Sequence, residues 1–187
     1  SFLVAPDGAI AAQYDKVHMF DVEVGDGQTY RESAAYAPGA RAVVAATPWG
    51  RLGMTVCYDV RFPYLYRSLA QAGAELISVP SAFTHVTGSA HWHVLLRARA
   101  IENGAFMVSA AQGGVHEDGR ETYGHSIIVD PWGRVIAEAD NAEPGVIVGR
   151  LDMNEVKAAR AKIPNLKNAR EYRTGHGMPT TKGEKVA

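Results

Sequence analysis

The stretch GMTVCYDVRFP, at residues 53–63, decides how this chain folds. Apolar side chains alternate over residues 51–56, which predicts a strand that ends at Cys57. Asp59 is a residue type that caps the start of a helix, and Pro63 suits a first helical turn. The local order is therefore strand, cysteine and helix, an order typical of α/β proteins.

Apolar and amphipathic segments alternate along the rest of the chain, and no period of ~20–50 residues repeats. We expect strands over 2–4, 9–14, 76–79, 106–110, 126–129, 135–137 and 146–151, and helices over 63–72, 91–103 and 153–162. Residues 23–41 are polar and rich in turn formers, which predicts a loop. The pattern indicates an α/β fold in which helices cover a mixed sheet.

The length of 187 residues fits one domain. We place this domain at residues 1–163 and a polar C-terminal arm at 164–187. The chain opens on Ser1 and runs at once into an apolar segment, so we expect it to be the remainder of a longer protein.

Composition excludes several classes of partner. The net charge of −1 offers no field that would attract nucleic acid or an anionic membrane. No window approaches the ~18 consecutive apolar residues of a membrane span, and the start lacks the charged region of a signal peptide. A single cysteine cannot form an internal disulfide, which favours a reducing, cytoplasmic location.

Two interpretations of Cys57 are open from its position alone. A lone cysteine after a buried strand is commonly a small core hydrophobe. A cysteine at the carboxyl end of a strand and the mouth of a helix also lies where α/β sheets hold ligands and where a thiol pKa is lowered. There the backbone amide of Tyr58 would point toward an oxyanion formed by attack of the sulfur on a carbonyl.

The segment YDKVHMFD, at residues 14–21, interleaves charged and apolar side chains. If it is extended, Lys16 and His18 lie on one face. His18 would then be a candidate base for Cys57, which is the arrangement of a Cys/His hydrolase. That mechanism predicts that His18→Ala abolishes activity while Lys16→Met is tolerated.

Other motifs carry no chemistry that we can assign. A glycine-rich phosphate loop at 25–30 lacks its last glycine, and a nucleophile elbow at 124–128 lacks its closing glycine. His91 and His93 are two apart on an expected helix, hence on nearly opposite faces, and cannot hold one metal together. We therefore expect no metal and no cofactor.

In these segments the chain resembles the carbon–nitrogen hydrolase (nitrilase) superfamily, and within it the Nit-type amidase branch. The motifs that carry the resemblance are YDKVHMFD (14–21), RES (31–33), GMTVCYDVRFP (53–63), HW (91–92), LRARAIEN (96–103), YGHS (123–126) and DPWG (130–133). They occur in family order and span residues 1 to about 172. Because so many motifs occur in family order, we interpret Cys57 as a reactive residue and not as a small core hydrophobe.

The resemblance implies an α-β-β-α sandwich that pairs through helices into a homodimer. It also implies a Glu–Lys–Cys site, in which Cys57 is the nucleophile, Lys16 stabilises the developing charge and Glu32 is a supporting glutamate. The sulfur attacks an amide or nitrile carbon, ammonia leaves, and water cleaves the thioester. His18 is then a packing residue rather than the base.

The chain departs from the family pattern in three places. The family's proton-accepting glutamate follows a first strand that lies ahead of the resemblance, and these residues contain no counterpart for it. Tyr64 and His93 stand where the branch often has glutamate. The first departure leaves a second hypothesis, that the chain is a non-catalytic fragment or an interaction module.

The branch suggests a small carboxylate-bearing amide as substrate, such as the ω-amide of a 2-oxo acid or a deaminated peptide amide. We expect Arg61 to pair with the substrate carboxylate, and Tyr58, Ser81 and Phe83 to line the pocket. A structural salt bridge is the alternative for Arg61.

Overall fold

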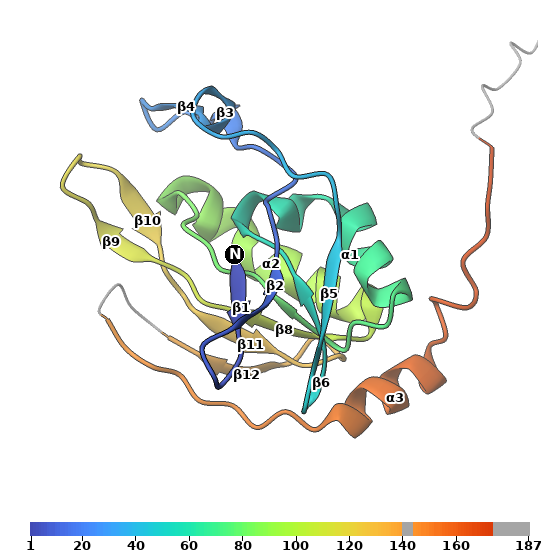
Figure 1. Ribbon diagram of the computed structural model, residues 1–187. Coiled ribbons are helices and arrows are strands. Elements are labelled where there is room, and N and C mark those ends of the chain that lie inside the picture. The colour runs from blue at the N-terminus through green and yellow to red at the C-terminus, as the bar shows by residue number, and fades with distance from the viewer. Residues whose placement is uncertain (140–143, 174–187) are drawn as a thin grey trace, which may run out of the picture.

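A six-stranded mixed sheet forms the centre of the protein (Figure 1). The structure is a computed structural model, and it describes residues 1–139 and 144–173. In spatial order the strands are β12 (Val135–Glu138), β11 (Ile127–Val129), β8 (Phe106–Ser109), β7 (Leu76–Ser78), β6 (Gly50–Met54) and β5 (Val43–Thr47). The three central strands β6, β7 and β8 are parallel, and the outer pairings are antiparallel. The predicted α/β class is confirmed.

Two helices pack together over one face of this sheet, α1 (Pro63–Gln71) and α2 (His85–Asn103). The core lies between them and the sheet, and its largest fully buried side chains include Trp92, Tyr66 and Leu69. The indole Nε1 of Trp92 donates to the carbonyl of His125 at 2.8 Å, so the polar atom of this buried ring is satisfied. Burial of these side chains is the main force that holds α2 against the sheet.

The other secondary structure in the described residues consists of three hairpins and three helical segments. The hairpins are β1 (Phe2–Val4) with β2 (Ile10–Gln13), β3 (Asp21–Glu23) with β4 (Thr29–Arg31), and β9 (Gly113–Val115) with β10 (Glu121–Tyr123). The helical segments are the 3₁₀ helices η1 (Glu32–Ala34) and η2 (Cys57–Arg61), and α3 (Met153–Lys162). In Figure 1 the hairpins β3–β4 and β9–β10 project from the same side of the molecule.

Most predicted strands and helices are confirmed within one or two residues at their ends. The loop predicted over 23–41 contains β4, and the sequence patterns predicted neither β3, nor β5, nor the hairpin formed by residues 113–123. Helix α2 begins at His85 rather than His91, because the Thr84 hydroxyl accepts the Thr87 N–H and caps the helix there.

Two local predictions are wrong. Residues 146–151 do not form a strand, and Val146 and Val148 are 89% and 85% exposed, so their apolar side chains contact no buried surface. Asp59 does not cap α1, whose N-cap is Phe62. The carboxylate of Asp59 instead accepts the Val56 N–H at the start of η2.

The predicted arm begins after α3, and residues 164–173 contain neither helix nor strand. The side-chain amide of Asn165 donates to the carbonyl of Glu102 at 2.6 Å, which holds the start of this segment on the end of α2. The remainder of the predicted arm, from 174 to 187, lies outside the described residues. Across the described ranges, no helix has both the length and the apolar content that a bilayer crossing requires.

The contact between α2 and β10 generates a stability prediction. A Cβ added at Gly88 would lie 2.2 Å from the Cβ of Tyr123, so the helix and the hairpin would have to separate. We expect Gly88→Ala to lower the free energy of unfolding by about 1–3 kcal/mol. Urea unfolding followed by circular dichroism measures it. The neighbouring exposed control Ser89→Ala should stay within about 0.5 kcal/mol of the parent, and equal stability of the Gly88 variant would contradict the packing.

Candidate active site

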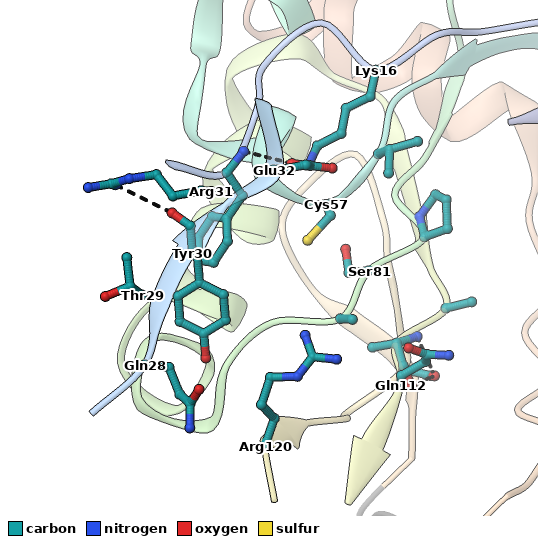
Figure 2. Close-up of a pocket in the computed structure, with 17 residues that line it drawn as sticks. Lys16, Gln28, Thr29, Tyr30, Arg31, Glu32, Cys57, Ser81, Gln112 and Arg120 are labelled. Carbon is teal, nitrogen blue, oxygen red and sulfur yellow. Dashed lines mark hydrogen bonds and ion pairs between the residues drawn. The ribbon is translucent and has the colours of Figure 1, made fainter. Parts of the chain in front are cut away.

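Cys57 follows β6 on a tight backbone turn that presents its side chain to a cavity. Its φ is 50°, in the left-handed region that side chains other than glycine rarely adopt. The Cys57 N–H donates to the carbonyl of Pro80 at 2.9 Å, which ties this turn to the end of the neighbouring strand β7. Figure 2 shows the thiol pointing into the space between Glu32 and Ser81. Strained backbone of this kind is concentrated at functional sites.

The turn is held from below by the carboxylate of Asp59, which is completely buried. One oxygen accepts the hydroxyl of Tyr14 at 2.7 Å and the N–H of Val56 at 2.9 Å. The other lies 3.1 Å from the backbone N and 2.8 Å from the ring Nδ1 of His18. A buried carboxylate requires such donors, and these four partners join the Cys57 turn to the segment around Lys16.

His18 belongs to this network and not to the cavity. Its ring stacks on Phe62 with centroids 3.5 Å apart and planes 5° from parallel, while Nδ1 faces Asp59. His18 is absent from the residues that line the cavity beside Cys57. This geometry favours a packing role for His18 over the base of a Cys/His pair.

Lys16 and Glu32 form an ion pair at the wall of the same cavity (Figure 2). The Glu32 carboxylate also accepts the N–H of Phe20 at 2.6 Å, so the segment that carries Lys16 holds this carboxylate at a second point. The Lys16 side chain is only 12% exposed, and a cation this buried requires a partner. The carbonyl of Lys16 accepts the N–H of Gly39 at 2.7 Å, which anchors the backbone on the other side.

The cavity measures about 880 Å³, within the range of sites for small molecules. Its floor comes from the ends of the parallel strands and its walls from the hairpins β3–β4 and β9–β10. The polar and charged lining residues are Lys16, Gln28, Thr29, Tyr30, Arg31, Glu32, Cys57, Ser81, Gln112, Arg120 and Ser126. Convergence of these groups on one nucleophilic side chain makes this cavity the candidate active site.

The environment of Cys57 acts on its pKa in both directions. Burial raises the pKa of the thiol, and this effect exceeds the others. A hydrogen bond from the Ala82 backbone, the positive charge of Lys16 and the Ser81 hydroxyl lower it, whereas the negative charge of Glu32 raises it. The two charges of the ion pair therefore oppose each other at the sulfur.

The residues predicted to bind substrate are not all at this cavity. Ser81 lines it, whereas Tyr58 and Phe83 line a separate, very small cavity that also touches Cys57. Arg61 is not in the lining: its Nη1 lies 3.2 Å from His91 Nδ1, and its guanidinium lies 5.1 Å from the centroid of the Phe83 ring. The structure therefore does not bring Arg61 to the lining of this cavity, because η2 directs this side chain toward α2.

Arg120 is the residue that sequence reasoning missed. It lies in the hairpin β9–β10, and Figure 2 shows its guanidinium directed into the cavity toward Ser81. Its Nε donates to Asp118 at 2.6 Å. The Asp118-Gly119 pair is a hairpin signal that predicts a turn, but no local pattern indicates that the hairpin folds over Cys57.

Comparison with known proteins finds a matching family model and similar proteins. The carbon–nitrogen hydrolase family model matches residues 1–161. A protein of Yersinia enterocolitica named deaminated glutathione amidase is 50% identical over 171 residues, which are 91% of this chain and 59% of that protein. The chain therefore spans about three fifths of the length of this curated relative.

Two solved structures resemble the fold. The Caenorhabditis elegans NitFhit protein superposes with a TM-score of 0.79 at 41% identity, over 90% of this chain and 41% of that one. An amidase variant from Nesterenkonia sp. AN1, with acrylamide added at its active-site cysteine, gives 0.70 at 33% identity, over 87% and 60%. These similarities support the α/β sandwich expected from the sequence.

The charge arrangement around Cys57 predicts opposite shifts in its reactivity. The thiolate is the form that reacts with iodoacetamide, so the alkylation rate rises with pH through the thiol pKa. Lys16→Met removes a charge that lowers this pKa, and the profile should move to higher pH by roughly one unit. Glu32→Gln removes a charge that raises it, and the profile should move to lower pH.

Cys57 is the one cysteine of the chain, so mass spectrometry of the alkylated protein reports on this thiol alone. Shifts of both variants in the same direction would show that the ion pair does not act on the sulfur as described.

Proposed function

This chain belongs to the carbon–nitrogen hydrolase family, and from that premise we propose that the whole protein hydrolyses the amide of a small carboxylate-bearing molecule. The observation that carries the proposal is the position of the Cys57 thiol, which opens into a cavity beside the Lys16–Glu32 ion pair. Acyl transfer uses a nucleophile and a fixed positive charge that stabilises the oxyanion, and Cys57 and Lys16 offer both at one cavity.

The proposed reaction has two halves. The Cys57 thiolate attacks the amide carbon, the carbonyl electrons move to oxygen, and the Lys16 ammonium stabilises that oxyanion. The C–N bond then breaks, the nitrogen takes up a proton and leaves as ammonia, and a thioester remains on the sulfur. Water adds to the thioester, which releases a carboxylic acid and restores the thiol. Glu32 holds Lys16 in place, and the thiol proton passes to the glutamate that the family carries ahead of the segment matched by this chain.

The name of the Yersinia relative favours a deaminated peptide amide as the substrate class. Such a molecule carries a carboxylate, and we assign this group to Arg120, whose guanidinium lines the cavity. Ser81 contacts the substrate from the end of β7. Tyr58 and Phe83 act from beneath the thiol, through the small cavity that they share with Cys57.

We also propose the domain bounds, the location and the partners of the protein. The hydrolase domain comprises residues 1–163, and 164–187 form an arm on the body or on a partner. The protein works as a cytoplasmic homodimer, without a metal or cofactor in the reaction and without nucleic acid or membrane partners. Light scattering on the purified protein measures the oligomeric state.

Ammonia release from amides of 2-oxo dicarboxylic acids and deaminated peptides tests the activity on the full-length protein. We expect release that Cys57→Ala abolishes and that Lys16→Met lowers by about 10²–10³-fold, because the oxyanion loses its charged partner. His18→Ala should keep a larger share of the rate than Lys16→Met, provided that circular dichroism shows a folded protein.

The opposite order, with His18→Ala inactive and Lys16→Met tolerated, would establish a Cys/His hydrolase instead. Release that survives Cys57→Ala would refute the mechanism. Absence of release from every amide, by a protein with a reactive Cys57, would favour the interaction module.

The assignment of the carboxylate generates a separate prediction. We expect Arg120→Gln to raise KM by about tenfold for carboxylate-bearing amides, since a charge-assisted hydrogen bond is lost, and to leave KM for neutral amides unchanged. Steady-state ammonia assays on matched pairs of amides measure this difference. If Arg61→Gln gives this pattern and Arg120→Gln does not, the carboxylate lies where the sequence alone placed it.

A further inference from the structure

Three side chains from separate elements converge at a second place in the molecule. His93 comes from α2, His125 from the link between β10 and β11, and Glu138 from the end of β12. The carboxylate oxygen Oε1 of Glu138 lies 2.7 Å from Nε2 of His93 and 2.8 Å from Nδ1 of His125. The three potential ligand atoms all lie within 4.8 Å of one another. None of these residues lines the cavity beside Cys57.

We propose that this cluster binds a divalent transition-metal ion, with Zn²⁺ as the preferred ion. Two imidazoles and one carboxylate are the donor set of zinc sites that keep a fourth position for water. At metal–ligand distances of about 2.0–2.2 Å, neighbouring ligands of a tetrahedral ion lie roughly 3.3 Å apart. The Glu138 contacts need to lengthen by only a few tenths of an ångström to reach this spacing. The inference does not depend on the proposed hydrolase activity.

The ligands are held in place by contacts of their own. His125 has a φ of 57°, in the left-handed region, and its carbonyl accepts the Trp92 indole N–H at 2.8 Å. Its ring stacks on Tyr123 with centroids 4.2 Å apart, and the ring of His93 meets Tyr123 edge-on. A buried tryptophan and an aromatic stack therefore fix the two imidazoles before an ion arrives, which lowers the entropic cost of binding.

The accessibility of the ligands also suits an ion. The three side chains are 25–31% exposed, so an ion can enter and a water can occupy the open position.

No pattern in the sequence indicates this cluster, because its members lie far apart in the chain. The expectation that His91 and His93 cannot share an ion agrees with their contacts, since His91 pairs with Arg61 and His93 with Glu138. Spacing along the sequence can reveal metal ligands only when they lie on one helix or strand. The three ligands proposed here lie on three separate segments of the fold.

Calorimetric titration of the full chain with zinc chloride at neutral pH tests the proposal. The titration uses the Cys57→Ala variant, so that the thiol cannot bind the ion. We expect one Zn²⁺ to bind with an affinity that Glu138→Gln and His93→Gln each weaken by about 10–100-fold. Co²⁺ in place of Zn²⁺ should give the visible absorption of a four-coordinate ion, and the same two variants should remove it.

His85→Gln is the matched control, because His85 also lies on α2, contacts Tyr123 edge-on and faces a glutamate, Glu121, at 3.9 Å. This variant should bind Zn²⁺ as the parent does. Absence of Zn²⁺ binding, or binding that Glu138→Gln and His93→Gln leave unchanged, would overturn the proposal. Thermal unfolding in EDTA shows whether each variant is folded. If Glu138→Gln does not fold, His93→Gln gives the decisive result, because it alters a partly exposed position on α2.

Discussion

The buried carboxylate of Asp59 is the interaction on which the site depends. Taking a charge out of water costs several kcal/mol unless donors surround it, and Tyr14, Val56 and His18 supply them here. These donors come from two segments, the turn that carries Cys57 and the segment on both sides of Lys16. Satisfying one carboxylate therefore brings the thiol and the ammonium to the same cavity. A buried side chain outside the cavity lining thus helps to position the groups that face the cavity.

The parallel strands supply the second constraint. Because β6, β7 and β8 run in one direction, their carboxyl ends meet at one edge of the sheet, where α/β proteins hold ligands. Cys57 follows β6, Ser81 follows β7, and Gln112 lies just beyond β8, so three segments distant in sequence share one floor. The hairpins β3–β4 and β9–β10 then add the polar walls. Rigid strands thus carry Cys57, and the hairpins carry polar groups that line the cavity beside it.

Sequence reasoning succeeded where the signal is local. The alternation before Cys57 and the proline at the first turn of α1 predicted the right elements, and ordered motifs pointed to Lys16 and Glu32. It could not predict contacts between distant segments. Arg61 and Arg120 offer the same side chain, and only the direction of η2 and the fold of the β9–β10 hairpin place Arg120, and not Arg61, in the cavity lining.

The same reason explains the other failures. Residues 146–151 alternate as a strand should, but a strand also needs a partner, and Val146 and Val148 remain exposed. The convergence of His93, His125 and Glu138 depends on how α2 lies against β11 and β12, which no spacing along the chain records. Local propensity thus fixed the elements, whereas tertiary packing fixed which side chains meet.

The most direct test is mass spectrometry of the full-length protein quenched with acid during turnover of a carboxylate-bearing amide. A turn held by Asp59 that presents Cys57 as the nucleophile predicts an added mass equal to the substrate less ammonia, located on the peptide that contains Cys57. An acyl group on any other residue, or turnover with no covalent species on Cys57 under conditions in which the thioester accumulates, would contradict it.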